Sequence, residues 1–166
     1  MRDEFSPQSN PNTVVREVNF DPARHLELLL IADPGEAALK AYLADSRIFG
    51  YTQDGAVLGV AALFDLPDGS VELKNIAVSP RAQRHGVGSA LIRSVKHCAG
   101  TRRLIVGTAD VSSEALAFYE WNGFVRYGTI PDFFVDHYSQ PVYDNGRLCR
   151  DMVLLEWKPD ENYITL

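Results

Sequence analysis

The sequence has few cysteines, and they lie too far apart to suggest a metal or redox site. Only two occur among its 166 residues, Cys98 and Cys149. They form no CxxC pair and no cluster with histidine, so neither a zinc site nor a dithiol redox centre is predicted. We expect two free thiols and no metal.

Long apolar runs are missing as well. The longest run, residues 56–64, is far shorter than the ~20 residues needed to cross a bilayer. No segment with a basic start and an apolar centre opens the chain, so secretion is not indicated. We therefore expect no membrane partner and a cytoplasmic location.

Positively charged residues are fewer than negatively charged ones. Sixteen lysines and arginines stand against 22 aspartates and glutamates, which gives a formal net charge of −6 and a pI of about 5.1. Such a surface repels long polyanions, so no nucleic-acid partner is expected. Hydrophobic residues at 46% and charged residues at 23% are typical of a folded globular chain rather than a disordered one.

Turn-forming residues divide the chain into alternating apolar segments. The polar residues 1–13 predict a flexible leader, 14–158 a single domain, and 159–166 a tail. Helical spacing places His25 and His97 on the surface. This order of segments predicts an α/β domain with a mostly antiparallel sheet. The predicted strands are 14–20, 47–53, 56–64, 71–78, 103–109, 124–130 and 148–157, the predicted helices are 22–32, 36–43, 86–98 and 112–122, and 131–146 is a long loop.

The strand predicted at 71–78 has an irregular apolar pattern. Val71 and Leu73 share one face, whereas Ile76 and Val78 fall on the other. One extra residue in the strand, a β-bulge, would produce this slip. A strand buried on both faces would produce it equally well, and both interpretations stay open.

Residues 83–90, QRHGVGSA, join this strand to the next predicted helix and form the most informative segment. Glycines let the backbone approach a ligand closely, and the first turn of a helix has unpaired N–H groups. No Ser, Thr, Asp or Asn caps the helix. Instead Arg81, Arg84 and His85 crowd its positive end, which costs ~0.3–1 kcal/mol per charge without an anion. A bound phosphate or pyrophosphate would resolve this conflict.

Three phosphate-binding patterns compete for this segment. A dinucleotide-binding loop would need a third glycine where Leu91 stands, and a Walker A loop needs a Gly-Lys-Ser/Thr run that is absent. The pattern Gln/Arg-x-x-Gly-x-Gly/Ala, which cradles the pyrophosphate of coenzyme A, fits at Gln83, Gly86 and Gly88. A plain glycine-containing turn between strand and helix is the alternative.

The flanking sequence resembles the GNAT N-acetyltransferase family. ELKNIAVSP stands upstream at 72–80 and ALAFYEWNGF downstream at 115–124, in the family's order of strand, phosphate loop, helix, strand and helix. The likeness covers roughly residues 56–124. It implies a small bacterial-type, single-domain member with acetyl-CoA as cofactor. The implied GNAT fold is a mixed, mostly antiparallel sheet of six to seven strands flanked by about four helices.

For the cofactor, the resemblance implies a pyrophosphate held by the main-chain N–H groups of 84–89. The strand at 76–78 would pair with the pantetheine arm as an added strand, and the N–H of Ile76 would polarise the acetyl carbonyl. Ser112 is a departure, because many members have an asparagine there that contacts the pantetheine. The cofactor residues implied are Ile76, Ala77, Val78, Gln83, Arg84, His85, Gly86, Val87, Gly88, Ser89 and Ser112.

Two residues match the family's catalytic groups. Tyr119 would protonate the departing thiolate, although packing of its ring on the sheet is an alternative role. Glu72 would take the proton from the amine, or would be a solvent-facing strand glutamate. Asp136 and His137 are further candidates for the base.

The predicted loop at 131–146 interleaves aromatic and acidic residues, which suits an ammonium substrate through charge and cation–π attraction. A solvated acidic rim around a packed phenylalanine has the same pattern. The candidate substrate residues are Phe133, Phe134, Asp136 and His137. We expect an N-acetyltransferase, monomeric or homodimeric, in which a small-molecule or peptide amine attacks acetyl-CoA directly in a ternary complex. A non-catalytic acyl-CoA-binding module is the alternative, and it would need neither Tyr119 nor Glu72.

Overall fold

The structure, a computed structural model, describes residues 10–160. The predicted leader and tail therefore lie largely outside the described residues. Within the described chain, contacts define two compact units. Residues 10–65 and 73–99 form the first unit, and residues 66–72 and 100–160 form the second.

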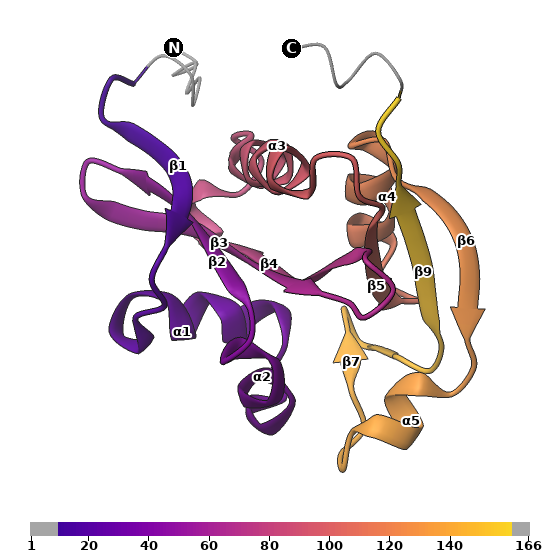
Figure 1. The fold of residues 1–166 in the computed structure, drawn as a ribbon. Helices are drawn as coiled ribbons and strands as arrows, with labels where there is room; N and C mark the ends of the chain where they lie inside the picture. Colours follow the sequence, from indigo (N-terminus) through magenta and orange to yellow (C-terminus); the bar gives the residue numbers. More distant parts are fainter. Residues whose placement is uncertain (1–9, 161–166) are drawn as a thin grey trace. The chain divides into compact units, whose positions relative to one another are not determined.

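The first unit is a four-stranded part of the sheet with helices on both faces. The described strands follow the order β1-β2-β3-β4, with β1 antiparallel to β2 and β2 antiparallel to β3. Helix α3 lies on one face of these strands, and α1 and α2 lie on the other (Figure 1). The elements are β1 (Thr13–Val18), α1 (Pro22–Ala32), α2 (Glu36–Leu43), β2 (Arg47–Gln53), β3 (Ala56–Asp65), β4 (Val71–Val78), the 3₁₀ turn η1 (Pro80–Ala82) and α3 (Val87–Ala99).

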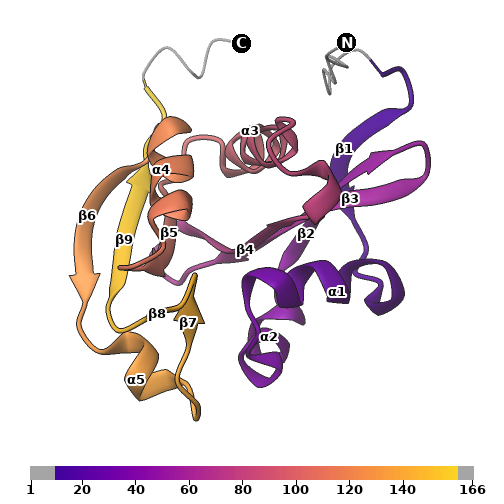
Figure 2. The same cartoon turned by 180° about the vertical axis from the view of Figure 1, so that it is seen from behind.

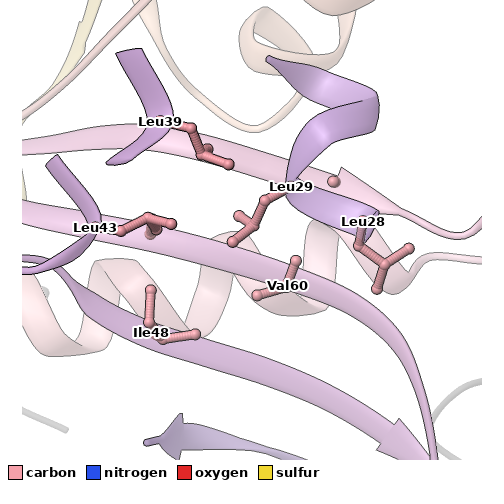
Figure 3. Close-up of a cluster of buried hydrophobic side chains, with 8 residues drawn as sticks. Leu28, Leu29, Leu39, Leu43, Ile48 and Val60 are labelled. Carbon is pink, nitrogen blue, oxygen red and sulfur yellow. The ribbon is translucent and has the colours of Figure 1, made fainter. Parts of the chain in front are cut away.

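Leucines of α1 and α2 form the core on one face of the first unit. The helix α1 begins where the sequence predicts, because the Asp21 side chain accepts a hydrogen bond from the N–H of Ala23 and Pro22 suits the first helical position. Leu28 and Leu29 then point toward the strands, as Figure 3 shows. The cluster of buried residues consists of Leu28, Leu29, Leu39, Leu43, Ile48, Val60, Ala62 and Ala77.

The second unit carries the remaining strands of the sheet. The last strand, β9, lies between β5 and β6 and is antiparallel to both (Figure 2). The start of β4 joins this unit, since the N–H of Val71 donates to the carbonyl of Arg103. The elements are β5 (Leu104–Ala109), α4 (Ser113–Trp121), β6 (Val125–Ile130), α5 (Phe133–His137), β7 (Tyr143–Asp144), β8 (Arg147–Leu148) and β9 (Met152–Trp157).

The predicted class, an α/β fold with a mostly antiparallel sheet, is confirmed, with seven sheet strands among the described residues. The predicted long loop at 131–146 is corrected, because it contains α5 and β7. The predicted last strand starts at Met152 instead of 148, since Arg147 and Leu148 pair with β7. His25 is also corrected: it is buried, whereas His97 is exposed as predicted.

Burial along β4 alternates without a slip. Val71, Leu73, Asn75 and Ala77 are buried, and the residues between them are half-buried. The irregular apolar pattern therefore arises because the polar residue Asn75 takes an inward position. The second face is half-buried rather than solvated, in line with the interpretation of a strand covered on both faces.

Candidate functional site

The loop between β4 and α3 has an unusual backbone conformation. Arg84 has φ 65° and Gly86 has φ 81°, so two residues of this short segment lie in the left-handed region. A non-glycine residue rarely adopts that conformation, and such strain gathers at functional sites. The N–H of Ala90 bonds back to the carbonyl of Gly86, so the N–H groups of 87–89 precede the first i→i−4 bond of α3.

The charge around this loop favours an anion. The first turn of α3 has no acidic residue. The side chains of Arg81, Arg84 and His85 are exposed beside it. Cations at the positive end of a helix are unfavourable until an anion binds there, so the loop suits a phosphate group.

The side chain of Gln83 connects the loop to the end of the preceding strand. Its Nε2 donates to the carbonyl of Val78 at 3.2 Å, which fastens the loop to the end of β4. The predicted role of Gln83, to open the loop, is compatible with this contact. Its side chain is otherwise exposed.

Gly59 allows β3 and the start of α3 to pack closely, a role that the sequence did not lead us to predict. A Cβ at this position would lie 2.8 Å from Val87 Cγ1 and 2.9 Å from Leu91 Cδ1. Only a glycine lets β3 and the first turn of α3 come this close. The signal was available, because a glycine within an apolar strand often marks a close approach.

Asn75 was missed as well, and it precedes the candidate oxyanion donor Ile76. Its side chain is 5% exposed. Its Nδ2 donates to the carbonyl of Leu29 at 2.9 Å and to the hydroxyl of Tyr42 at 3.2 Å. These bonds tie α1 and α2 to β4 beside the predicted pantetheine strand, in which Ala77 is buried and Ile76 is half-buried.

In the second unit, Tyr119 is buried within an aromatic group. Its ring packs edge-on against Phe118 at 5.3 Å and Phe124 at 5.7 Å between centroids. Removal from water raises the pKa of its phenol well above the ordinary value of 10.0. The hydroxyl therefore stays protonated at neutral pH and is able to donate a proton, while its ring also serves the packing role.

Ser112 sits just before α4 and is nearly buried. Its hydroxyl donates to the carboxylate of Asp144 in β7. The donor function of this serine is thus already used, although its oxygen is still able to accept a bond. Ser112 therefore differs chemically from an asparagine, whose amide would offer two N–H donors.

The candidate bases lie on different elements of the second unit. Glu72 is half-buried at the start of β4. His137 is exposed at the end of α5, and its Nδ1 lies 2.9 Å from the carbonyl of Phe133. A neutral imidazole that donates from Nδ1 keeps a free lone pair on Nε2, which is the form a base needs.

The candidate substrate residues share the short helix α5. The Phe133 ring stacks on His137 at 4.2 Å and meets Phe134 edge-on at 5.3 Å. Phe134 in turn stacks on Tyr138 at 5.6 Å. The structure thus brings Phe133, Phe134 and His137 together, while Asp136 is exposed beside them.

Three backbone and ionic contacts anchor the start of α5 to the residues just before β9. The N–H of Asp132 donates to Asp151, and its carboxylate pairs with Arg150 Nε at 2.6 Å. The N–H of Phe134 donates to the carbonyl of Arg150. The aromatic helix therefore has a fixed position in its unit.

Three other sequence predictions concern the cysteines, metal binding and membrane-spanning segments. Both cysteines are free thiols, as expected. Across residues 10–160, no three His, Cys, Asp or Glu side chains gather in a group that could hold a metal. In that same range no helix has the length and apolarity to cross a membrane.

Known proteins resemble this chain in sequence and in structure. A family model described as an acetyltransferase (GNAT) domain matches residues 44–126. The uncharacterised N-acetyltransferase YvbK of Bacillus subtilis (strain 168) is 33% identical over 132 residues, 78% of this chain and 85% of that protein.

Two solved structures illustrate the structural match. The IAA acetyltransferase from Bacillus cereus ATCC 14579 superposes with a TM-score of 0.81 at 33% identity, covering 89% of this chain and 99% of that one. A GNAT family acetyltransferase from Elizabethkingia anophelis, solved with acetyl-CoA bound, gives 0.83 at 27% identity, covering 90% and 100%.

Proposed function

Because this chain belongs to the GNAT acetyltransferases, we propose that it transfers an acetyl group from acetyl-CoA to a primary amine in a ternary complex. The observation that carries the proposal is the loop before α3, with its left-handed residues, cations and acid-free first helical turn. Structures of relatives contain acetyl-CoA or CoA, which supports the same cofactor here.

We assign the cofactor's pyrophosphate to the N–H groups of residues 84–89. Arg84 adds positive charge at the same place, and the imidazole of His85 is exposed beside it. The pantetheine arm would pair with the backbone of Ile76–Val78, and the N–H of Ile76 would donate to the thioester carbonyl. Acetyl-CoA supplies the electrophilic carbonyl carbon and a thiolate leaving group.

The chain's own acid and base complete the transfer. The neutral amine forms a bond to the carbonyl carbon, and the carbon–sulfur bond breaks. Tyr119 would give its proton to the departing thiolate, since burial keeps the phenol protonated. Glu72 would remove the proton that the amine loses, because an alkylammonium of pKa ~10 is mostly charged at neutral pH.

The base is assigned by paired substitutions. Glu72→Gln and His137→Gln each remove one candidate while keeping a similar side-chain size. If Glu72 is the base, Glu72→Gln lowers kcat/KM at neutral pH about 100-fold, whereas His137→Gln leaves kcat/KM nearly unchanged. The reverse result would move the role to His137.

The acceptor we propose is a small cationic amine bound near α5. Exposed Asp136 and the stacked rings of Phe133, Phe134 and His137 offer charge and cation–π attraction to an ammonium group. IAA belongs in the test as well, because a relative of 33% identity is an IAA acetyltransferase. We propose that the enzyme works in the cytoplasm as a monomer or homodimer.

The test is thiol release from acetyl-CoA with a panel of polyamines, amino acids, aminoglycosides, peptide N-termini and IAA. We expect at least one acceptor to give thiol release together with a product about 42 Da heavier than the acceptor, because an acetyl group replaces a hydrogen. Tight acetyl-CoA binding without turnover across the panel would instead identify a binding module.

A further inference from the structure

A pocket lies in the first unit, between the β2–β3 hairpin and the loop before α3. Its volume is about 440 Å³, within the range of roughly 300–1,000 Å³ of small-ligand sites. It is lined by Gln53, Asp54, Ala56, Leu58, Arg81, Ala82 and His85. Among these residues, His85 is assigned to the proposed cofactor site, and Arg81 is one of the cations beside that site.

The floor of this pocket is apolar. Leu58 is 7% exposed and Ala82 is 4% exposed, and Ala56 is half-buried beside them. A bound molecule therefore needs an apolar body to cover this floor. An inorganic ion would leave the floor wet and most of the volume empty.

The two ends of the pocket carry opposite charges. At the hairpin end stands the carboxylate of Asp54, held by the side-chain amides of Asn10 and Asn12. At the loop end stand the exposed Arg81 and His85. A simple anion would meet the charge of Asp54, and a simple cation would meet that of Arg81, so neither matches both ends.

Gln53 adds an unsatisfied acceptor at the acidic end. Its Oε1 is buried and has no hydrogen-bond partner among the described residues. Leaving such an atom unpaired is unfavourable, because it has lost its hydrogen bonds to water. Gln53 as a whole is half-buried and lines the pocket, so a rotation of its amide would let Oε1 meet a donor in the pocket. An ammonium group next to Asp54 is such a donor.

We propose that this pocket binds a small zwitterion, an α-amino acid with an apolar side chain. Its ammonium group lies between Asp54 and Gln53 Oε1, its carboxylate faces Arg81, and its side chain covers Leu58 and Ala82. Since Arg81 and Ala82 belong to the turn that leads into the phosphate loop, occupancy changes the affinity for acetyl-CoA. This coupling rests on the proposed function, whereas the binding itself does not.

The binding is tested by calorimetric titration of the full-length protein, without cofactor, with L-leucine. We expect saturable binding, with N-acetyl-leucine and isoamylamine at least 10-fold weaker, because each lacks one of the two charges. Equal affinity for either analogue, or no heat with leucine up to solubility, would overturn the proposal.

Substitutions locate the site. Arg81→Ala and Asp54→Asn should each weaken leucine binding at least 10-fold. Asparagine tolerates the left-handed conformation of position 54, φ 51°, so the hairpin turn is kept. Arg16→Ala removes an exposed arginine of β1 outside the pocket and should leave the affinity unchanged. An equal loss in Arg16→Ala would mean that the effect is one of net charge.

Acetyl-CoA titrations with and without leucine then test the coupling. An altered acetyl-CoA affinity that disappears in Arg81→Ala supports an effector site. If leucine is itself acetylated and Arg81→Ala abolishes that reaction, the pocket is an acceptor site and the effector assignment is wrong. Leucine binding in a protein that fails to bind acetyl-CoA would leave the pocket standing and refute the proposed function alone.

Discussion

Tyr119 illustrates how one buried residue would combine its structural role with the chemical role proposed for it. Its ring packs between Phe118 and Phe124, and its phenol stays protonated because burial raises the pKa. Tyr119→Phe keeps the ring and removes only the hydroxyl group. We expect kcat to fall about 100-fold, at the low end of general acid catalysis, because a thiolate is already a fair leaving group. Acetyl-CoA affinity, measured by calorimetry, should not change.

An unchanged kcat in Tyr119→Phe would remove the acid role and leave ring packing as the function of this residue. Thermal unfolding provides the control. Since the ring is retained, a large drop in melting temperature would show that the substitution disturbed the fold and not only the chemistry.

His25 shows what a helical pattern misses at the residue scale. The sequence prediction placed it on the surface, yet it lies three and four residues before the buried Leu28 and Leu29, shares their face of α1, and is 3% exposed. Its Nδ1 accepts a hydrogen bond from the N–H of Asp21 at 2.9 Å, which requires the neutral ring. Burial, and then the charge of Arg24, lower the pKa of His25 below 6.5. The unfolded state therefore binds a proton more readily than the folded state.

It follows that acid should destabilise the protein through His25. The contribution of this residue is fully present above pH 6.5 and is lost as the pH falls from there toward the lowered folded pKa. In His25→Asn an amide oxygen is able to accept the same bond and does not titrate. We expect urea unfolding to show a smaller loss of stability between pH 7 and pH 5 in His25→Asn, and an identical loss would contradict this assignment.

At the scale of elements, the contact between β3 and α3 positions the phosphate loop. Gly59 allows Val87 and Leu91 to lie where a Cβ would otherwise stand. Gly59→Ala should push the first turn of α3 away from β3 and cost ~1–3 kcal/mol of stability, as overpacking does. Coenzyme A affinity should fall as well, because the N–H groups of that turn move.

Gly128→Ala is the matched control, also a strand glycine. A Cβ there would meet Leu154 Cδ1 at 3.7 Å, an ordinary contact distance. We expect a change of stability within ~0.5 kcal/mol and no change in coenzyme A affinity. Full cofactor affinity in a folded Gly59→Ala protein would show that this contact does not position the loop.

Most element positions followed from local signals in the sequence. The helix predicted from residue 22 begins at Pro22, and the strands predicted at 47–53 and 56–64 form the β2–β3 hairpin, whose turn residues Asp54 and Gly55 both have positive φ. The segment 131–157 was predicted less well. Its helix α5 has five residues and no buried side chain, so it leaves no apolar periodicity, and its position depends on Arg150 and Asp151 far along the chain.

At the scale of the whole molecule, we expect the charge distribution to favour binding of one small anionic ligand and to disfavour binding of long polyanions. The net charge of −6 repels a polyanion, while Arg81, Arg84 and His85 concentrate positive charge beside one helix terminus. We expect no gel shift of duplex DNA or RNA at about 150 mM salt, where the Debye length is ~8 Å and only close contacts count. Coenzyme A should bind under the same conditions.

A shift of nucleic acid at micromolar protein would contradict this prediction. Raising the salt should weaken coenzyme A binding only modestly, because the ligand also uses backbone N–H groups and apolar contacts. A steep salt dependence would instead mean that surface charge dominates its recognition.

The sequence by itself determined the class of the fold, the order of most elements and the candidate phosphate loop. Hydrophobic period, turn residues and a six-residue glycine pattern are local properties, and local properties can be read along a chain. Only the tertiary structure decided that His25 and Asn75 are buried, that Ser112 is bound to Asp144, that Gly59 seats α3, and that Asp54 and Arg81 face one pocket. Each of these features depends on residues far apart in sequence, because a side chain becomes buried or meets a distant partner only after those segments have packed together.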